Sequence, residues 1–432
     1  MPKKLILVTG ATGYIASRLI PQLLERGYAV RALARNPLQL RARNWSSKVE
    51  IFQGDILEPD SLAPALKDVH TAYYLVHSMA MGTGYTELET RVAGNFVHAA
   101  EMAGVQHIIY LGGLADQDQP ISPHLLSRIK TGDALREGKI PVTEFRASVI
   151  VGSGSISFEM IRFMTELFPI IPSHVWLKNR AQPIAVQNIM DYLLLALEKW
   201  DETGRVIEIG GPEVITYQDL MLRYAHARGH RRSFLFLPAI PVWFMAFGVG
   251  LVTPVPRRIA RPLVRGMSHD SIVTHKSMDE VYPEVKPMDF ESAVSQALAC
   301  LHPLKIEPVW ADGEHHDRTL RHEGFFIDHR EFTVNAEPEK VFNVITEFGE
   351  SFGPQRFVVD TLEPDHFLLL RSQRRIPGEG WLEWRISRAE NQTRLTQTFF
   401  FAPRGMAGFL YWYLLYPFHL LEIMRVVRTI TI

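Results

Sequence analysis

The first 150 residues alternate short apolar runs with segments of helical periodicity. Short apolar runs that end at glycine or polar residues are typical of buried strands. Between these runs, apolar positions recur three and four residues apart, which is typical of helices packed on one side. The runs are "KLILVTG", "YAVRALAR", "VEIFQGD", "TAYYLVHS", "HIIYLGG" and "VTEFRASVIVG". This alternation predicts βαβ units with right-handed crossovers, and therefore an α/β domain with a doubly wound parallel sheet of the Rossmann type.

After about residue 325 the pattern changes to strands separated by turns. The expected strands are "FFIDHREFTVNA", "HFLLLRSQRR", "GWLEWRISRA" and "TRLTQTFFFAP", with a helix at "PEKVFNVITEF". A long apolar and aromatic helix, "GMAGFLYWYLLYPFHLLEIMRVVRTI", is expected at the end. This order predicts a smaller α+β domain. We expect the α/β domain to cover 1–303, a polar linker to cover 304–324, and the α+β domain to cover 325–432.

Residues 234–256 contain no charged side chain and have a pair of arginines on either side. The length approaches that of a membrane span, but prolines near both ends limit the helical part to about 242–252. A helix that short does not cross a bilayer of about 30 Å. Two interpretations stay open: a buried or inter-domain helix, or a helix lying in the membrane interface with the arginines at the headgroups.

Charge and cysteine content narrow the functional classes. The formal net charge of the 432 residues is -1, so no global field attracts nucleic acid, and we expect no such partner. Cys300 is the only cysteine, which fits a reducing cytoplasm. We expect a cytoplasmic protein, with peripheral contact at the inner face of the membrane if 234–256 is an interfacial helix. No zinc-ligand spacing occurs, and His315 and His316 are expected to be solvated, so no metal site is predicted.

The strongest chemical signal is the loop in "LILVTGATGYIASRLI". Gly10, Gly13 and Ala16 follow a strand and open a helix with the spacing G-x-x-G-x-x-A. Gly10 permits the tight turn, and Gly13 lets the backbone approach a pyrophosphate whose charge meets the helix N-terminus. The sequence therefore predicts a dinucleotide site. The other loop residues expected to contact the dinucleotide are Thr12, Tyr14 and Ile15.

The end of the second strand indicates which dinucleotide is preferred. NAD-binding proteins place an acid there for the ribose hydroxyls, but no Asp or Glu occurs between Arg26 and Lys48. Arg35 is instead placed to bind a 2′-phosphate, so we expect NADP(H) in preference to NAD(H). Arg41 and Arg43 are expected on a solvated helix face.

Two later strand ends add candidate cofactor contacts. Asp55 and Ile56, after the third strand, are expected at the adenine, although Asp55 could instead cap the next helix. His77 and Ser78 leave the fourth strand and are expected beside the nicotinamide. Tyr85 is a further residue expected to line the cleft.

Together these segments resemble the extended and atypical short-chain dehydrogenase/reductases, especially their NmrA-like branch. The resemblance covers roughly residues 1–300 and rests on "TGATGYIA", "GDILEPDSL", "YYLVHSM", "IIYLGGL" and "FRASVIVGSGS". The later segments "FTVNAEPEKVFNVI", "PGEGWLEWRI" and "APRGMAGFLYWYLLYPFH" resemble a C-terminal module found joined to such domains in bacteria. They suggest a START-like fold, and that resemblance implies an apolar small molecule held between sheet and helix.

The resemblance also exposes a departure from the family. Standard members use a Tyr-x-x-x-Lys pair on the helix after the fifth strand, but "SPHLLSRIKTGDALRE" has no tyrosine. In one register His124 takes the tyrosine position and Arg128 the lysine position. In the other, Leu126 and Lys130 take them. The first keeps polar groups at both positions and is preferred, with His124 as a possible general acid and Arg128 holding the ribose.

Several functions fit this sequence. The first is an NADP(H)-dependent oxidoreductase acting on an apolar carbonyl or enone. The second is a binding protein without turnover, either an NmrA-like NADP(H) sensor or a membrane-associated assembly factor. A nucleotide-sugar epimerase is third, because the resemblance implies that its chemistry uses the missing tyrosine.

Overall fold

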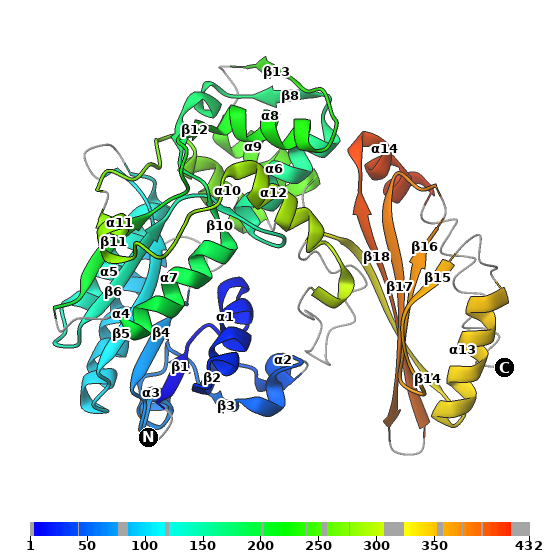
Figure 1. Cartoon of the computed structure of the whole chain (residues 1–432), viewed down its shortest axis with the longest axis horizontal. Helices are drawn as coiled ribbons and strands as arrows, with labels where there is room; N and C mark the ends of the chain where they lie inside the picture. Colours follow the sequence, from blue (N-terminus) through cyan, green and yellow to red (C-terminus); the bar gives the residue numbers. More distant parts are fainter. Residues whose placement is uncertain are drawn as a thin grey trace.

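The structure is a computed structural model of the whole chain. It describes residues 4–41, 43–76, 85–116, 121–199, 203–237, 241–252, 257–275, 277–305, 324–351, 357–373, 375–389 and 392–415. A seven-stranded parallel sheet with the order β11-β6-β5-β4-β1-β2-β3 forms the centre of the first domain (Figure 1). Its strands are β1 (Leu5–Val8), β2 (Ala29–Ala34), β3 (Glu50–Gln53), β4 (Thr71–Tyr74), β5 (His107–Gly113), β6 (Val142–Ala147) and β11 (Arg205–Ile209). The predicted doubly wound α/β fold is confirmed.

Helices cover both faces of this sheet because its strands are apolar on both sides. In β1, Ile6 and Val8 pack on one side with α1 (Tyr14–Glu25) and α7 (Val186–Glu198). Leu7 points to the other side. That side is covered by α3 (Pro59–Leu66), α4 (Tyr85–Met102) and α5 (Pro123–Arg136). The strand order reverses beside β1, so the loop after β1 opens at the edge where ligands bind in such sheets. The short helix α2 (Pro37–Arg41) follows β2.

A second group of elements lies beyond the carboxyl ends of the strands (Figure 1). The run "VTEFRASVIVG" divides between β6 and β7 (Ile150–Val151), since β7 pairs with β10 (Ile184–Ala185) outside the main sheet. The helices are α6 (Ile156–Leu167), α8 (Tyr217–Ala227), α9 (Val242–Val252), α10 (Arg257–Gly266) and α12 (Phe290–Ala299), whereas α11 (Ser277–Val281) packs beside β11. The remaining strands are β8 (Ile170–Ser173), β9 (Arg180–Ala181), β12 (Ile215–Thr216) and β13 (Ser233–Phe236). The helix predicted at 242–252 is confirmed as α9.

The C-terminal domain is an antiparallel sheet with the order β14-β18-β17-β16-β15. The strands are β14 (Phe326–Val334), β15 (Phe357–Glu363), β16 (Phe367–Ser372), β17 (Gly378–Ala389) and β18 (Gln392–Pro403). Helix α13 (Pro338–Ser351) packs Val341, Phe342 and Ile345 into a core with one sheet face. The predicted α+β class is confirmed, whereas the START-like assignment stays a prediction.

Two C-terminal elements differ from the sequence expectation. Strand β15 was not predicted, because it is an edge strand whose apolar side chains are largely exposed and give no clear alternation. The expected long final helix begins as α14 (Gly405–Leu410) and continues as a π-helical turn, Tyr411–Leu415. The rest of that expectation falls on 416–432, outside the described residues.

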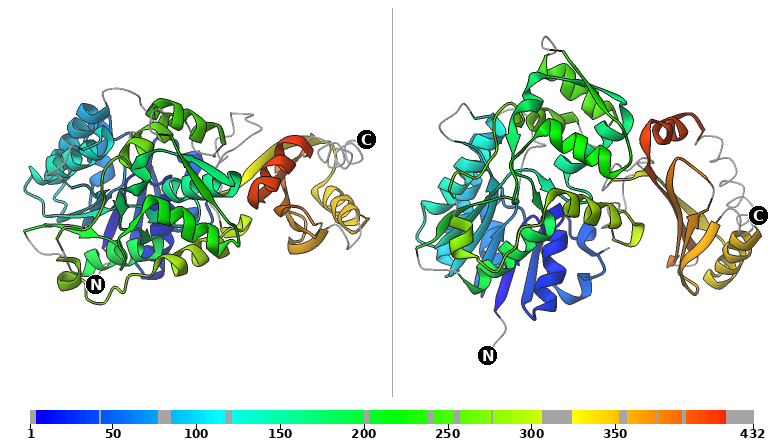
Figure 2. Two further views of the ribbon diagram at one scale, coloured as in Figure 1. Left: turned by 90° about the horizontal axis from the view of Figure 1, so that it is seen from above. Right: turned by 45° about the horizontal axis from the view of Figure 1, so that its top comes forward.

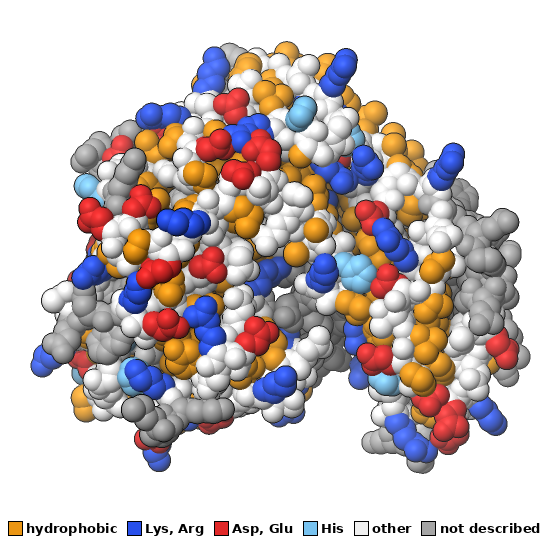
Figure 3. All heavy atoms as spheres, in the orientation of Figure 1, with side chains coloured by type: hydrophobic (Ala, Val, Ile, Leu, Met, Phe, Trp, Pro, Cys, Tyr) orange, Lys and Arg blue, Asp and Glu red, His pale blue; other side chains and the backbone are white. Residues whose placement is uncertain are grey.

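Helix α6 joins the two domains, which lie side by side in Figure 2. The ring of Phe163 packs edge-on against Phe326 and Phe409, with centroid separations of 5.5 Å in both cases. One turn further along, the Glu166 carboxylate accepts the backbone N–H of Gly405 at 2.7 Å. On the face shown in Figure 3, acidic and basic side chains are interspersed, as the near-zero net charge predicts.

Candidate functional site: a dinucleotide cleft that opens into an apolar chamber

The loop after β1 has the geometry that a pyrophosphate requires. Gly10 has φ +62°, and a Cβ there would lie 2.6 Å from the carbonyl oxygen of Leu75. The N–H of Gly13 donates to the Gly10 carbonyl at 2.8 Å, which closes the turn. Gly13 is the N-cap of α1 and offers no capping side chain, so the first N–H groups of the helix can bind an anion.

A cavity of about 620 Å³ extends from this loop across the carboxyl edge of the sheet. Eight of the residues predicted to bind the cofactor line it: Gly10, Thr12, Gly13, Tyr14, Ile15, Arg35, Asp55 and Ile56. His77 and Ser78 lie outside the described residues, as does the side chain of Tyr85. The structure therefore brings predicted residues from the ends of three separate strands together around one cavity.

The arginines near β2 have different roles. Arg35 is exposed directly after the strand and lines the cavity. Arg31 is buried and donates to Glu50 at 2.8 Å and to two carbonyl oxygens, so it is structural. Arg41 is exposed as expected, but the expectation for Arg43 is wrong because it is only 7% exposed. Helix α2 ends at Arg41, and a turn closed by the Arg43 N–H on Leu40 directs the side chain inward.

Asp55 is held in place rather than capping a helix. Its Oδ1 accepts the N–H of Leu57 at 3.0 Å, and Ser61 Oγ donates to its carbonyl oxygen at 2.8 Å. The N-cap of α3 is Glu58, so the capping alternative for Asp55 is wrong. Asp55 and the adjacent Ile56 thus form a fixed wall of the cavity below Arg35.

Helix α5 presents His124 and Arg128 to the same cavity. Leu126 and Lys130, the pair from the alternative register, are both exposed and do not line it. Arg128 donates from Nη2 to the Leu111 carbonyl, and its guanidinium carbon lies 5.1 Å from the centroid of the Tyr110 ring. The geometry therefore favours the register that keeps polar groups at both family positions.

Glu89 is a cavity residue that the sequence reasoning missed. This carboxylate on α4 is 6% exposed, lines the cavity and accepts a hydrogen bond from the hydroxyl of Ser127. Ser127 precedes Arg128 on α5, so Glu89 supports the segment that carries the candidate pair. A signal was present in the sequence, because Glu89 interrupts an apolar stripe that continues with Val92 and Phe96.

Neither Tyr74 nor Tyr110 replaces the missing tyrosine. Burial, reinforced by Tyr110 and Glu89, raises the pKa of Tyr74, which lines the cavity. Burial also raises the pKa of Tyr110, whose hydroxyl donates to the Arg128 carbonyl at 2.8 Å. A tyrosine acting in acid–base chemistry needs its pKa lowered toward neutrality, which is the opposite shift.

Beyond the candidate pair, the cavity becomes an apolar chamber built by α6, α8, α9 and α10. Methionine is unbranched and polarizable, so a wall rich in it adapts to bulky apolar ligands of different shape. Ser148, just after β6, has a buried Oγ with no hydrogen-bond partner in the described part of the chain, and it faces this region. The methionines that line the chamber are Met160, Met164, Met221, Met245 and Met267.

The described residues also bear on metal binding and on membrane insertion. They contain no group of three or more His, Cys, Asp or Glu side chains placed to hold a metal ion. Within the same residues, no helix combines the length and apolar character needed to cross a membrane. The pair His315–His316 lies outside the described residues.

The glycine loop, the sheet order and the cleft define a Rossmann domain of the dinucleotide-binding class. Residues 2–161 match the NmrA-like family, and residues 355–426 match a family described as a protein of unknown function, DUF2867. The resemblance to the NmrA-like branch is confirmed for the matched residues. The loop fits a dinucleotide because a Cβ at Gly10 has no room and the orphaned Ser148 hydroxyl faces the same space.

Several of the sequence relatives are enzymes, and another is the photosystem II assembly factor Ycf39 of Cyanophora paradoxa; each shares only part of its length with this chain. A 3β-hydroxysteroid dehydrogenase/Δ5→4-isomerase of Mycobacterium tuberculosis is 32% identical over 122 residues, which is 24% of this chain and 30% of the relative. The chloroplastic divinyl chlorophyllide a 8-vinyl-reductase of Zea mays is 24% identical over 222 residues, 48% of this chain and 55% of the relative. The match thus covers between 25% and 63% of the length of these curated relatives.

Solved structures match the whole α/β domain. The triphenylmethane reductase of Citrobacter sp., also solved with NADP(H), has a TM-score of 0.55 at 22% and 20% identity in the two structures. In both, the match covers 68% of this chain and 99% of the other. UDP-glucose 4-epimerase of Thermotoga maritima has a TM-score of 0.51 at 17% identity, with 68% and 97% covered. These likenesses show the fold, and together with the family match they show a domain that binds a nicotinamide dinucleotide.

Proposed function

We propose that the protein is an NADP(H)-dependent oxidoreductase that reduces an apolar carbonyl or enone. The observation that carries this proposal is the continuity of one cavity, from the glycine loop and Arg35, past His124 and Arg128, into the methionine-lined chamber. A bound NADPH supplies a hydride to an acceptor beside it. An acceptor in the chamber is surrounded by apolar side chains, which favours bulky apolar substrates over sugars.

The candidate residues then have separate roles. His124 can hold a proton at the substrate oxygen, because its side chain lines the cavity at the family position of the proton donor. Arg128, fixed by the Leu111 carbonyl, can hold the cofactor ribose. Glu89 keeps the helix in place through Ser127. Ser148 can bind an amide or carbonyl with its unpartnered hydroxyl.

Replacing Arg35 with alanine is expected to weaken NADPH binding about 10-fold to 100-fold and to leave NADH binding nearly unchanged. The reason is that a guanidinium bond to a phosphate contributes roughly 1.5–3 kcal/mol, and NADH lacks that phosphate. Calorimetric titration with both dinucleotides measures the difference. Arg41→Ala is the matched control, because Arg41 is exposed and does not line the cavity. Equal weakening of NADPH and NADH in the Arg35 variant refutes the phosphate role.

Replacing His124 with alanine is expected to lower turnover about 100-fold or more, as removal of a general acid does. The measurement is the loss of NADPH absorbance with a panel of apolar aldehydes, ketones and enones. Lys130→Ala on the exposed side of α5 is the control and should keep the wild-type rate. Tight NADPH binding by the wild type without turnover of any panel member would reject the oxidoreductase proposal.

The second candidate is a binding protein that senses NADP(H) or assists assembly without turnover. The observation in its favour is the end of β5, where the resemblance implies a serine and this chain has Gly112 and Gly113. A Cβ at Gly113 would lie 2.8 Å from Leu125 Cδ2, so the packing does not accommodate a hydroxyl side chain without movement. An epimerase is third, since its fold matches but the tyrosine position holds His124.

Three finer expectations accompany this proposal. We infer a division into 1–303, a linker at 304–324 and 325–432. We also infer an apolar small-molecule ligand of the START-like C-terminal domain, and a cytoplasmic location with peripheral membrane contact through 234–256. The surface of α9 and α10 supports the inference of membrane contact.

A further inference from the structure

Helix α9 lines the apolar chamber with some of its side chains and exposes others to solvent. On its inner side, Met245 and Val249 line the cavity. On its outer side, three large aromatic side chains are exposed to solvent by 60%, 52% and 45% of their area. They are Trp243, Phe244 and Phe247. Clustered exposed aromatics are unusual on a soluble surface and indicate a contact that water does not provide.

The charged residues that flank this helix in the sequence have a single sign. Residues 220–269 contain eight arginines and no Asp or Glu. Some of these arginines serve the protein itself: Arg223 pairs with Glu291, and Arg228 and Arg232 donate to Glu166 and to its backbone. The arginines with described side chains that are exposed are Arg231, Arg261 and Arg265, the last two on α10, which packs against α9.

We propose that the exposed side of the α9–α10 hairpin docks on an anionic lipid bilayer. Aromatic side chains insert at the headgroup boundary, and neighbouring arginines bind the anionic headgroups, which is the usual composition of an interfacial helix. A second copy of the chain is a poorer occupant, because a two-fold contact through this patch brings arginines against arginines. The bilayer supplies both the apolar phase and the opposite charge.

The docked helix lies in the plane of the interface. Its 11 residues are about 16 Å long, roughly half the bilayer core. The chamber then lies directly behind the membrane-facing wall, so its apolar ligand is taken from the lipid phase. This last step rests on the proposed function, whereas docking itself does not.

Flotation of the full chain with vesicles tests the proposal. One set of vesicles is phosphatidylcholine alone, and the other contains phosphatidylglycerol as well. We expect flotation with the anionic vesicles only. Trp243→Ser/Phe247→Ser should abolish it, and Arg261→Gln/Arg265→Gln should weaken it about 25-fold, since each basic residue near an anionic surface contributes roughly fivefold. Met102→Ser and Arg388→Gln, exposed on α4 and β17, are matched controls that should float like the wild type.

Each result decides a separate point. Failure of the wild type to float, or equal flotation of the α9 variant, overturns the docking proposal whatever the enzyme does. If light scattering shows a dimer that Trp243→Ser/Phe247→Ser converts to a monomer, the patch is a contact between copies and the proposal is wrong.

Turnover of an apolar enone dissolved in vesicles, compared with the same enone in detergent, tests whether the substrate enters the chamber from the lipid phase. If the rate in vesicles is no higher than in detergent, the proposed entry from the lipid phase is wrong. If there is no turnover in either medium, the oxidoreductase proposal is wrong and the docking proposal is unaffected.

Discussion

Replacing Gly10 with alanine is expected to weaken NADPH binding about 100-fold, or about 2.8 kcal/mol. Two effects combine at this position. A non-glycine residue at φ +62° costs roughly 1–2 kcal/mol, and the new Cβ would lie 2.6 Å from the Leu75 carbonyl oxygen. That oxygen belongs to the backbone directly after β4 and cannot rotate away. The loop must therefore move relative to the strand, and the N–H groups that bind the pyrophosphate move with it. Titration of NADPH by intrinsic fluorescence measures the loss.

Two variants separate the causes of this loss. Gly27→Ala is the control for backbone strain, because Gly27 has φ +82° and its Cβ would meet nothing within 4 Å. It should cost roughly 1 kcal/mol of stability and leave NADPH binding unchanged. Gly13→Ala covers the case in which the Gly10 variant does not fold, since Gly13 has φ -81° and tolerates a side chain conformationally. Its Cβ would lie 3.0 Å from the Gly10 carbonyl oxygen and would crowd the turn proposed to bind the pyrophosphate, so normal NADPH binding by this variant contradicts the assignment of the loop.

The α/β fold was predictable because its signals are local and repeated. The central strands of the sheet are short and apolar on both faces, as "LILV" in β1 shows, and β1 to β5 are each followed by a helix. The glycine loop was predictable for a similar reason, since its spacing and its strand–turn–helix context are contiguous. Strand β15 gave no comparable signal, because a half-exposed edge strand is specified by its partner β16 rather than by its own pattern.

The rest of the site depends on contacts between distant segments. Glu89 and Ser127 are 38 residues apart, and their pairing follows only from the packing of α4 on α5. The chamber gathers methionines from four separate regions, which no spacing rule connects. Arg43 shows that the sequence pattern can also fail at short range. It was expected at the surface, but the turn after α2 places its side chain in the interior.

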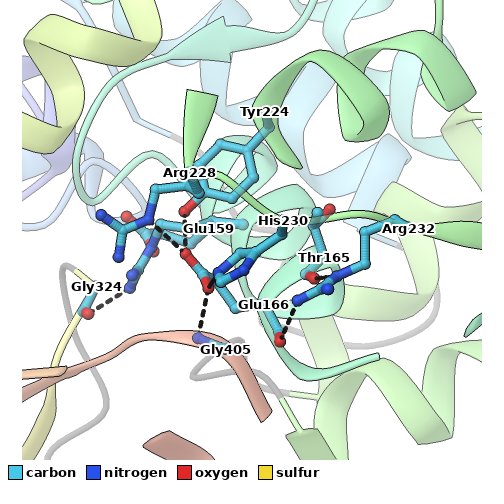
Figure 4. Close-up of polar contacts among 10 residues, drawn as sticks. Glu159, Thr165, Glu166, Tyr224, Arg228, His230, Arg232, Gly324 and Gly405 are labelled. Carbon is cyan, nitrogen blue, oxygen red and sulfur yellow. Dashed lines mark hydrogen bonds and ion pairs between the residues drawn. The ribbon is translucent and has the colours of Figure 1, made fainter. Parts of the chain in front are cut away.

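The carboxylate of Glu166 contacts four polar groups, one of which, the Gly405 N–H, belongs to the C-terminal domain (Figure 4). Its Oε1 accepts the Tyr224 hydroxyl and Arg228 Nε, both at 2.7 Å. Its Oε2 lies 2.8 Å from His230 Nε2 and accepts the Gly405 N–H at 2.7 Å. Arg162, one turn earlier on α6, donates to the Gly324 carbonyl. One helix therefore lines the chamber with Met160 and Met164 and carries the second domain on its other side.

Burial would raise the pKa of Glu166, but Arg228 and the hydrogen bonds from Tyr224 and Gly405 outweigh it and lower the pKa below the usual 4.5. As the pH falls, the unfolded chain takes up this proton first. The stability that the carboxylate contributes is therefore complete above pH 4.5 and is lost as the pH falls through the lowered folded value. The cationic groups that face it are Arg162, Arg228 and Arg232, and the titratable imidazole of His230 also contacts it.

Replacing Glu166 with glutamine is expected to destabilise the protein by roughly 3–5 kcal/mol, because it removes the buried carboxylate charge that pairs with the partly buried Arg228. We expect calorimetric unfolding to separate into two transitions as the C-terminal domain loses its attachment to α6. Lowering the pH below 4.5 should separate the transitions of the wild type in the same way and change the variant little.

Glu383→Gln is the matched control, since Glu383 is equally buried but pairs with Arg385 inside one strand. It should destabilise the C-terminal sheet without releasing the domain from α6. A single transition in Glu166→Gln, with the wild-type dependence on pH, would show that the aromatic contacts of Phe163 suffice to hold the domains together.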